Sequence, residues 1–287
     1  MDHPNKTVFV TGVSSGIGWG AVKVLSGKGW RVFGSVRKAE DGERLKAEFG
    51  EAFTPVVFDV TDEAAVRAGA DQVRALLGGR KLGGLVNNAG VALGGPAIYM
   101  DVDVFRKQLE VNLVGVLIAT QAFAPLLGAD PALEGPPGRI VNIGSVGGRS
   151  AFPFMLPYHT SKFGLEGFTD SLRRELMIFG IDATLVAPGS VATRIWGKAE
   201  QEDWSHYDDT AYRGPLKRMM GAIKGTAAKG VAPERIGEAI ATQLSSANPK
   251  TYVRITSEPL RFLATTRLPA RMVDRIVARQ LGLTRET

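Results

Sequence analysis

The fold is decided by the stretch Thr7-Val8-Phe9-Val10-Thr11-Gly12-Val13-Ser14-Ser15-Gly16-Ile17-Gly18, residues 7–18. It opens with a short apolar run, passes into a glycine turn, and is followed by apolar residues at helical spacing, Ala21, Val22 and Leu25. Glycines are needed where the backbone turns tightly and a pyrophosphate approaches the main chain, because exposed N–H groups and the helix dipole then bind the phosphate charge. The stretch therefore predicts a strand, a phosphate-binding turn and a helix, with the spacing TGxxxGxG rather than GxGxxG.

Predicted strands and helices alternate along the rest of the chain. The further predicted strands are residues 31–36, 56–58, 85–86, 139–143, 183–186 and 252–255. The further predicted helices are residues 39–49, 62–77, 104–127 and 157–176, with a loop at 128–138 before the fifth strand. This alternation predicts an α/β fold with a doubly wound, Rossmann-like, seven-stranded parallel sheet flanked by helices. Because no repeat or linker divides the chain, residues 1–287 are expected to form a single dinucleotide-binding and catalytic domain.

Composition narrows the class of protein. Hydrophobic residues make up 44% of the 287 residues and charged residues 22%, which is ordinary for a globular protein. The net charge of +6 permits an anionic ligand such as a phosphorylated cofactor, and no basic block with interleaved aromatic residues indicates nucleic acid. The chain has no cysteine, and its three histidines, His3, His159 and His206, lack metal-ligand spacing. No disulfide, thiol nucleophile or metal site is therefore expected.

Targeting signals are not evident either. Residues 1–6 lack the apolar run of a signal peptide. We find no window of about 18 apolar residues, so a membrane-spanning helix is not expected. A reducing, cytoplasmic setting is the expectation that follows.

Residues at the ends of the second and third predicted strands indicate how the cofactor is recognised. Arg37 and Lys38 follow the second strand, a position that faces the adenosine ribose in a dinucleotide fold. An acidic residue there suits a 2′-hydroxyl and a basic one a 2′-phosphate, so this position favours NADP(H) over NAD(H). The alternative is that both are solvated charges opening a loop. Asp59 ends the third strand, where it either accepts a hydrogen bond from adenine or forms a turn before the next helix.

Tyr158 and Lys162 are the candidate catalytic pair. They lie four residues apart on a predicted helix, so both side chains project from one face. A free tyrosine titrates near pH ~10, and a neighbouring ammonium favours the phenolate. Ser145 lies on a Gly/Ser turn after the fifth strand, where its hydroxyl can meet the same substrate oxygen. Asn112 lies in an apolar helical stretch and is either a structural bridge between strands or part of a proton path. A tyrosine and a lysine at this spacing are also common surface neighbours, and the upstream motifs are what favour catalysis.

Together these motifs resemble the short-chain dehydrogenase/reductase family, of the compact single-domain kind, over residues 6–255. The resemblance implies a catalytic tetrad of Asn112, Ser145, Tyr158 and Lys162. It also implies cofactor contacts from the turns and strand ends, namely Thr11, Gly12, Ser14, Ser15, Gly16, Ile17, Gly18, Arg37, Asp59, Val60, Asn88, Ala89, Gly90, Tyr158, Lys162, Pro188, Gly189, Val191 and Thr193. The loop at 128–138 is longer than this family pattern leads us to expect. Residues 158–168 look like the branch that acts on retinols, hydroxysteroids and related apolar alcohols.

The function implied by the resemblance is an NADP(H)-dependent oxidoreductase that interconverts an apolar alcohol with a ketone or aldehyde. Tyr158 would act as general acid or base, Lys162 would lower the pKa of Tyr158 and hold the nicotinamide ribose, and Ser145 would bind the substrate oxygen. One alternative is a catalytically silent nucleotide-sensing or scaffold protein on the same fold, which has no need of the tetrad. Another is a sugar-nucleotide epimerase or dehydratase, for which the glycine spacing and the C-terminal length do not fit. A homodimer or homotetramer is also expected.

Two C-terminal segments are expected to enclose the substrate. Residues 193–232 are predicted to form a lid, and residues 258–287 a helical extension. The apolar pocket is expected from the segment after Ser145 and from the lid, namely Phe152, Phe154, Met155, Leu156, Trp196, Trp204, Tyr207, Met219 and Met220. The extension carries an amphipathic helix with an arginine stripe at Arg271, Arg275 and Arg279. Packing against the body or a second subunit, closure over the substrate entrance, and peripheral contact with an anionic membrane surface remain open.

Overall fold

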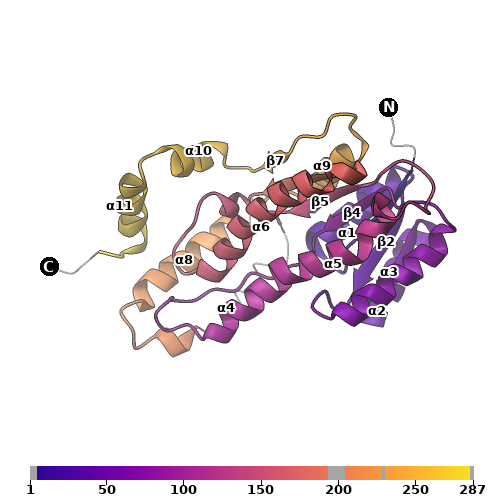
Figure 1. Cartoon of the computed structure of the whole chain (residues 1–287). Coiled ribbons are helices and arrows are strands. Elements are labelled where there is room, and N and C mark those ends of the chain that lie inside the picture. Colours follow the sequence, from indigo (N-terminus) through magenta and orange to yellow (C-terminus); the bar gives the residue numbers. More distant parts are fainter. Residues whose placement is uncertain (1–4, 193–203, 228–229, 285–287) are drawn as a thin grey trace.

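A seven-stranded parallel sheet forms the centre of the computed structural model, which describes residues 5–192, 204–227 and 230–284 (Figure 1). The strands are β1 (Thr7–Val10), β2 (Arg31–Val36), β3 (Phe53–Val57), β4 (Gly84–Asn87), β5 (Arg139–Ile143), β6 (Asp182–Pro188) and β7 (Tyr252–Ile255). They pair in parallel in the order β3-β2-β1-β4-β5-β6-β7. The predicted fold class, a doubly wound parallel sheet, is therefore confirmed.

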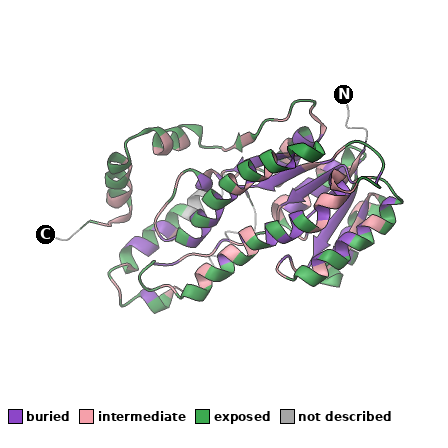
Figure 2. Cartoon of the chain, in the orientation of Figure 1, coloured by how far each residue is buried: buried purple, intermediate pink, exposed green. Residues whose placement is uncertain are grey.

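Helices cover both faces of this sheet. The helices of the described residues are α1 (Gly16–Gly27), α2 (Ala39–Phe49), α3 (Glu63–Leu77), α4 (Val102–Leu109), α5 (Gly115–Ala124), α6 (Leu156–Glu175), α8 (Arg213–Ala227), α9 (Pro233–Ser245), α10 (Pro259–Arg267) and α11 (Ala270–Leu281), of which the last two lie away from the sheet. Alternate residues of β1 belong to opposite faces: Phe9 packs with α3 and α5, whereas Val8 and Val10 pack with α1 and α9. Both sides of the five inner strands, β1, β2, β4, β5 and β6, are consequently buried (Figure 2), as a parallel sheet between helical layers requires, whereas the edge strands β3 and β7 are partly exposed.

The strand order places the ligand-binding edge of the sheet. The chain builds β1, β2 and β3 outward in one direction and then returns to place β4 on the other side of β1. Ligands of open α/β sheets bind outside the carboxyl ends of the strands at such a switch point. The glycine turn after β1 and the turn at residues 88–90 after β4 both lie there.

Two elements differ from their predicted form. The third strand begins at Phe53 rather than at residue 56, because β3 is the edge strand, where Pro55 costs less of the hydrogen-bond ladder. The single helix predicted at 104–127 begins at Val102 and contains two π-helical turns, Glu110–Val114 and Pro125–Ala129. The first of them contains Asn112.

The same helical run corrects one expectation about membranes. Among the described residues, Val102–Ala129 is long and apolar enough to cross a membrane, judged by length and composition only, with a mean hydropathy of 1.7. Part of this run, 44% of the window, is buried inside the protein. Phe123, Leu126 and Leu127 belong to the core on one face of the sheet, and a core helix passes the same test.

The C-terminal extension forms two helices rather than one. The predicted amphipathic helix is α11, and α10 precedes it. Neither helix contains a buried residue, and both run along one end of the molecule, away from the sheet (Figures 1 and 2). Leu281 and Leu283 pack against a small cluster of Phe154, Tyr207 and α8 residues. Within the predicted lid, residues 204–227, which include α8, and 230–232 are described, whereas 193–203, among them the predicted pocket residue Trp196, and 228–229 lie outside the described residues.

Candidate active site

The turn after β1 has the conformation that a phosphate cradle needs. Gly12 and Gly16 adopt φ values of +69° and +61°, in the left-handed region that favours glycine. The Ser35 hydroxyl of β2 accepts a hydrogen bond from the Gly12 N–H at 2.9 Å. Ser15 is the N-cap of α1, and its side chain makes no capping hydrogen bond. The helix N-terminus is thus open to an anionic ligand.

The turn after β4 holds this glycine turn in place. The Asn88 side-chain amide donates to the carbonyl oxygens of Thr11 and Gly12, at 2.8 and 2.9 Å. The Thr11 hydroxyl accepts from the N–H groups of Asn88 and Ala89, both at 2.9 Å. A Cβ on Gly18 would lie 2.3 Å from the Gly12 carbonyl oxygen. These residues therefore fix the shape of the turn through direct contacts between the two loops.

A cavity of about 660 Å³ lies at this edge of the sheet. The predicted cofactor residues that line it are Gly12, Ser14, Ser15, Gly16, Ile17, Arg37, Asp59, Val60, Asn88, Ala89, Gly90, Tyr158, Lys162, Pro188, Gly189 and Val191. Thr11 and Gly18 do not line it and act behind its wall, and Thr193 lies outside the described residues. An open helix N-terminus, glycines at positive φ and a cation at the end of β2 fit a phosphorylated dinucleotide.

Some residues of this cavity were not predicted. Arg106, Lys107 and Glu110 of the α4 region line it, although nothing in their spacing marks them in the sequence. Asp59 lines it too, but its Oδ1 accepts from the N–H and the hydroxyl of Thr61, at 3.0 and 2.8 Å. Asp59 therefore forms the turn that was one of its two expected roles, and its contact with adenine stays a prediction.

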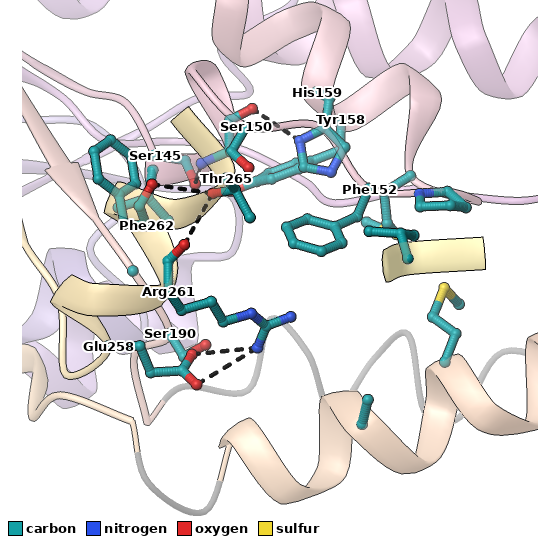
Figure 3. A pocket seen from close by; sticks show the side chains of 18 of the residues that line it. Ser145, Ser150, Phe152, Tyr158, His159, Ser190, Glu258, Arg261, Phe262 and Thr265 are labelled. Atoms are coloured by element: carbon teal, nitrogen blue, oxygen red, sulfur yellow. Dashed lines mark hydrogen bonds and ion pairs between the residues drawn. The ribbon is translucent and has the colours of Figure 1, made fainter. Parts of the chain in front are cut away.

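Ser145 and Tyr158 meet in the candidate catalytic centre. Tyr158 lies in the first turn of α6, and Ser145 follows β5 in a turn where its Oγ accepts from the Gly147 N–H at 3.0 Å. The Ser145 hydroxyl is hydrogen-bonded to the Tyr158 phenol (Figure 3). Both side chains are buried, so a substrate oxygen reaching them would be shielded from bulk water.

The charge state of this centre differs from the prediction. Burial raises the pKa of Tyr158 above its ordinary value, and the hydrogen bond from Ser145 opposes this rise only in part. Burial lowers the pKa of Lys162 to about 8. The Lys162 ammonium donates to the Ile143 carbonyl oxygen at 2.8 Å and lies 5.9 Å from the Tyr158 ring centroid. The expected lowering of the phenol pKa by Lys162 is not seen in this structure, because Lys162 is not among the causes of the shift and desolvation of the buried phenol dominates.

Asn112 bridges two segments of the site. Its Oδ1 accepts from the Val91 N–H at 2.9 Å, and its amide donates to the Val91 carbonyl at 3.0 Å and to Ser161 Oγ at 3.0 Å. Ser161 Oγ in turn donates to the Tyr158 carbonyl oxygen at 2.7 Å. Asn112 thus ties the loop after β4 to the first turn of α6, rather than bridging strands.

A second cavity, of about 580 Å³, meets the first at Ser145, Tyr158 and Gly189. Phe152, Met155 and Met219 of the predicted apolar set line it. It is also lined by residues that were not predicted for the pocket: His159, Glu258, Arg261, Phe262 and Thr265, which Figure 3 labels, and Arg218, Val277, Gln280 and Leu281. Most of these come from α10 and α11, so both helices of the C-terminal extension contribute to the wall of this cavity.

His159 is a wall residue of this second cavity with a defined protonation pattern. Its Nδ1 lies 2.8 Å from the Gly147 carbonyl oxygen, and because a carbonyl can only accept, Nδ1 carries the proton. Burial lowers the pKa of His159, which keeps the ring neutral near pH 7. The sequence placed His159 between Tyr158 and Lys162 without assigning it a role.

Comparisons with known proteins agree with this geometry. The family model described as short chain dehydrogenase matches residues 6–204. An NADPH-dependent 3-dehydrocapnine reductase from Ornithobacterium rhinotracheale is 36% identical over 97% of this chain and 98% of its own. The 17-beta-hydroxysteroid dehydrogenase type 6 of Bos taurus is 35% identical over 71% of this chain and 61% of its own.

Solved structures show the same fold. A short-chain dehydrogenase from Streptomyces avermitilis superposes with a TM-score of 0.75 at 24% identity, covering 96% of this chain and 95% of its own. A variant of actinorhodin polyketide ketoreductase with NADPH gives a TM-score of 0.72 at 28% identity, over 88% of this chain and 97% of its own. With the glycine turn, the tyrosine–serine centre and the matched family model in agreement, the chain belongs to the short-chain dehydrogenase/reductase family.

Proposed function

We propose that this protein is an NADP(H)-dependent oxidoreductase that interconverts an apolar alcohol with the corresponding ketone or aldehyde. The observation that carries the proposal is the position of Ser145 and Tyr158 on the wall shared by the two cavities. A carbonyl in one cavity and a nicotinamide in the other would meet at these two hydroxyls. When bound, NADPH supplies the hydride.

The protein's own residues supply the proton and the positioning. Because burial raises the pKa of Tyr158, its phenol stays protonated at neutral pH, as a general acid for carbonyl reduction requires. In alcohol oxidation the same oxygen takes the proton back. Ser145 holds the substrate oxygen beside the phenol, and Lys162, which lines the first cavity, holds the nicotinamide ribose. Asn112 fixes the first turn of α6 through Ser161.

A preference for NADP(H) is supported by the charge at the end of β2. Arg37 lines the cavity there, and a guanidinium can meet phosphate oxygens with two parallel hydrogen bonds. The Ornithobacterium relative is NADPH-dependent, which supports the same cofactor preference. Loss of one charge-assisted hydrogen bond costs on the order of 1.5–3 kcal/mol, so Arg37→Ala should weaken NADPH binding about ten-fold or more while changing NADH binding little.

Fluorescence titration with both cofactors tests this preference. Lys38→Ala is the matched control, because Lys38 is the next residue and does not line the cavity. Equal losses of NADPH and NADH affinity in Arg37→Ala would show that Arg37 is only a surface charge.

We also propose a homo-oligomer and a cytoplasmic setting. The oligomer is supported by exposed apolar side chains along the π-helical turn before α5, along α5 and α6, and in the 3₁₀ turn after α6, namely Val114, Leu117, Leu156, Phe163, Met177, Ile178 and Phe179. Light scattering after gel filtration tests the first statement, and a monomeric mass at micromolar concentration would refute it. Fractionation of cells that express the protein tests the second.

The activity itself is tested by following nicotinamide absorbance with both cofactors. The substrates should be apolar ketones, aldehydes and alcohols, together with 3-dehydrocapnine and a 17-beta-hydroxysteroid, on which the two relatives act according to their names. We expect turnover with NADPH and an apolar carbonyl compound. NADPH binding without turnover of any substrate would favour the silent nucleotide-sensing protein, and clear preference for sugars would overturn the apolar assignment.

A further inference from the structure

The second cavity is not uniformly apolar. One part of its wall is formed by Phe152, Met155, Met219 and Leu281. Another part carries charged side chains from three segments: Arg218 of α8, Glu258 just before α10, and Arg261 of α10. Figure 3 shows Arg261 and Glu258 in the same pocket as Ser145 and Tyr158. Two guanidinium groups in a cavity wall add nothing to the binding of a purely apolar ligand.

Arg261 is held in place but weakly paired. Its Nη1 lies 3.5 Å from both carboxylate oxygens of Glu258, and its guanidinium carbon lies 5.0 Å from the centroid of the Phe152 ring. The two charged side chains are 47% and 43% exposed, and an ion pair this long and this exposed contributes little free energy. An anionic ligand group can therefore compete with Glu258 for the guanidinium.

Arg218 adds a second positive charge to the same wall. Its Nη1 donates to the Leu281 carbonyl oxygen at 2.9 Å, which ties α8 to the end of α11. Within the described part of the chain it forms no ion pair with a carboxylate. Two arginines against one glutamate leave the charged wall with net positive charge, beside an apolar wall and a carbonyl-activating centre.

We propose that the substrate is an amphiphile: a carbonyl compound with an apolar chain and an anionic group, a carboxylate, sulfonate or phosphate, that binds Arg261 with help from Arg218. The proposal rests on the proposed function and names its substrate class. The anionic group orients the molecule, the apolar chain lies along Met155, Met219 and Leu281, and the carbonyl oxygen reaches Ser145 and Tyr158. Steroids and retinoids, which lack the anion, are then poorer substrates.

Matched pairs of ketones test this assignment. The probes are 4-, 6- and 8-oxododecanoate, each beside its neutral methyl ester, with a long-chain oxo-sulfonate added to separate carboxylate from sulfonate recognition. We expect the wild-type enzyme with NADPH to favour at least one acid over its ester by about ten-fold in kcat/KM, the lower range for a charge-assisted contact at an exposed site.

Three variants assign that preference to the charged wall. Arg261→Gln should remove most of the acid-to-ester ratio, chiefly by raising KM for the acid, and Arg261→Lys should restore part of the ratio. Glu258→Gln should raise the ratio, because it removes the competing carboxylate. Arg275→Gln is the matched control, since this exposed arginine of α11 does not line the cavity and its removal should leave the ratio unchanged.

The outcomes separate the two proposals. If the wild-type enzyme reduces acids and esters equally, or if Arg261→Gln keeps the acid preference, the amphiphile proposal is wrong while the oxidoreductase function stands. If neither acid nor ester is reduced although NADPH binds, the amphiphile proposal is wrong, and the proposed function is also wrong if none of the apolar carbonyl compounds of the wider panel is reduced. If Arg275→Gln lowers the acid-to-ester ratio as much as Arg261→Gln does, the preference for acids comes from general surface charge. The assignment of the anion site to Arg261 would then be wrong.

Discussion

At the scale of single residues, one oxygen atom carries the proposed acid–base chemistry. Tyr158→Phe removes the phenol oxygen but keeps the ring, which packs with Ala92 and Met155. Positioned acid–base groups contribute about 10²–10⁴-fold, so we expect a loss of turnover in this range, with the NADPH Kd unchanged. Stopped-flow absorbance and a binding titration measure the two quantities. Near wild-type kcat in this variant would contradict the role of Tyr158.

The lysine beside it should leave a signature in the pH profile. Since burial lowers the pKa of Lys162 to about 8, the side chain is a cation below this pH and neutral above it. Burial raises the pKa of Tyr158, so the phenol does not titrate in the same range. We expect kcat/KM for NADPH to fall as the pH rises through about 8, because this parameter reports the free enzyme.

The variant Lys162→Arg identifies the group responsible for this decline. Arginine stays charged at all accessible pH values, so residual activity in the variant should show no decline near pH 8. A decline that persists in Lys162→Arg would assign it to another group.

The site residues differ in how far sequence could reveal them. Tyr158, Lys162 and Ser145 stand in recognisable spacing, and the structure brings them together. The direction of the Tyr158 pKa shift was not predictable, because spacing along a helix does not give the degree of burial. Arg261 was not predicted to line the pocket for a related reason. Its position there depends on how α10 packs, whereas the sequence around it indicates only an exposed, amphipathic stretch.

At the scale of elements, the glycine turn depends on the close approach of α1 to the loop after β4. A Cβ at Gly18 would lie 2.3 Å from the Gly12 carbonyl oxygen and 2.6 Å from the Asn88 side-chain nitrogen. Overpacking of this kind costs about 1–3 kcal/mol, so Gly18→Ala should lower the Tm and weaken NADPH binding together. Calorimetry and a binding titration measure these effects.

Gly27→Ala is the matched control on the same helix. Gly27 is the last residue of α1, and a Cβ there would meet nothing within 4 Å. We expect an unchanged or slightly raised Tm and an unchanged NADPH Kd, because alanine is the better helix former. A loss of cofactor affinity in this control would point to a general sensitivity of α1 rather than to the contact at Gly18.

The elements themselves were largely predictable, and the exceptions have physical causes. The strands at 31–36, 139–143 and 252–255 are found with the predicted bounds, because their apolar runs end at clear turn residues. Residues 53–55 were not assigned to a strand, since Pro55 discourages strand formation unless the strand lies at an edge. The π-helical turn at Asn112 leaves no mark in hydrophobic periodicity, yet it places the amide against Val91 and Ser161.

At the scale of the whole molecule, the two cavities depend on different parts of the chain. No residue of α10 or α11 lines the first cavity, whereas Arg261, Phe262, Thr265, Val277, Gln280 and Leu281 line the second. Truncation after Glu258 should therefore raise KM for a bulky apolar substrate by about ten-fold or more, the loss expected when a few methylene-sized contacts disappear. The NADPH Kd should stay fixed.

Folding and assembly serve as the controls for this truncation. Because α10 and α11 contain no buried residue, their removal should leave the sheet folded, as judged by circular dichroism and the Tm. Loss of folding or of subunit association would instead support packing as the main role of the tail.

The exposed position of α10 and α11 also bears on how their backbone exchanges hydrogen with solvent. Helices without buried side chains open locally at small free-energy cost, so their amides should exchange quickly in the free protein. A substrate that fills the second cavity touches the inner sides of both helices and should slow exchange over residues 259–281, whereas amides of β1 and β4 should exchange at the same slow rate with and without it. Deuterium uptake in this segment would then report occupancy of the substrate cavity without any turnover.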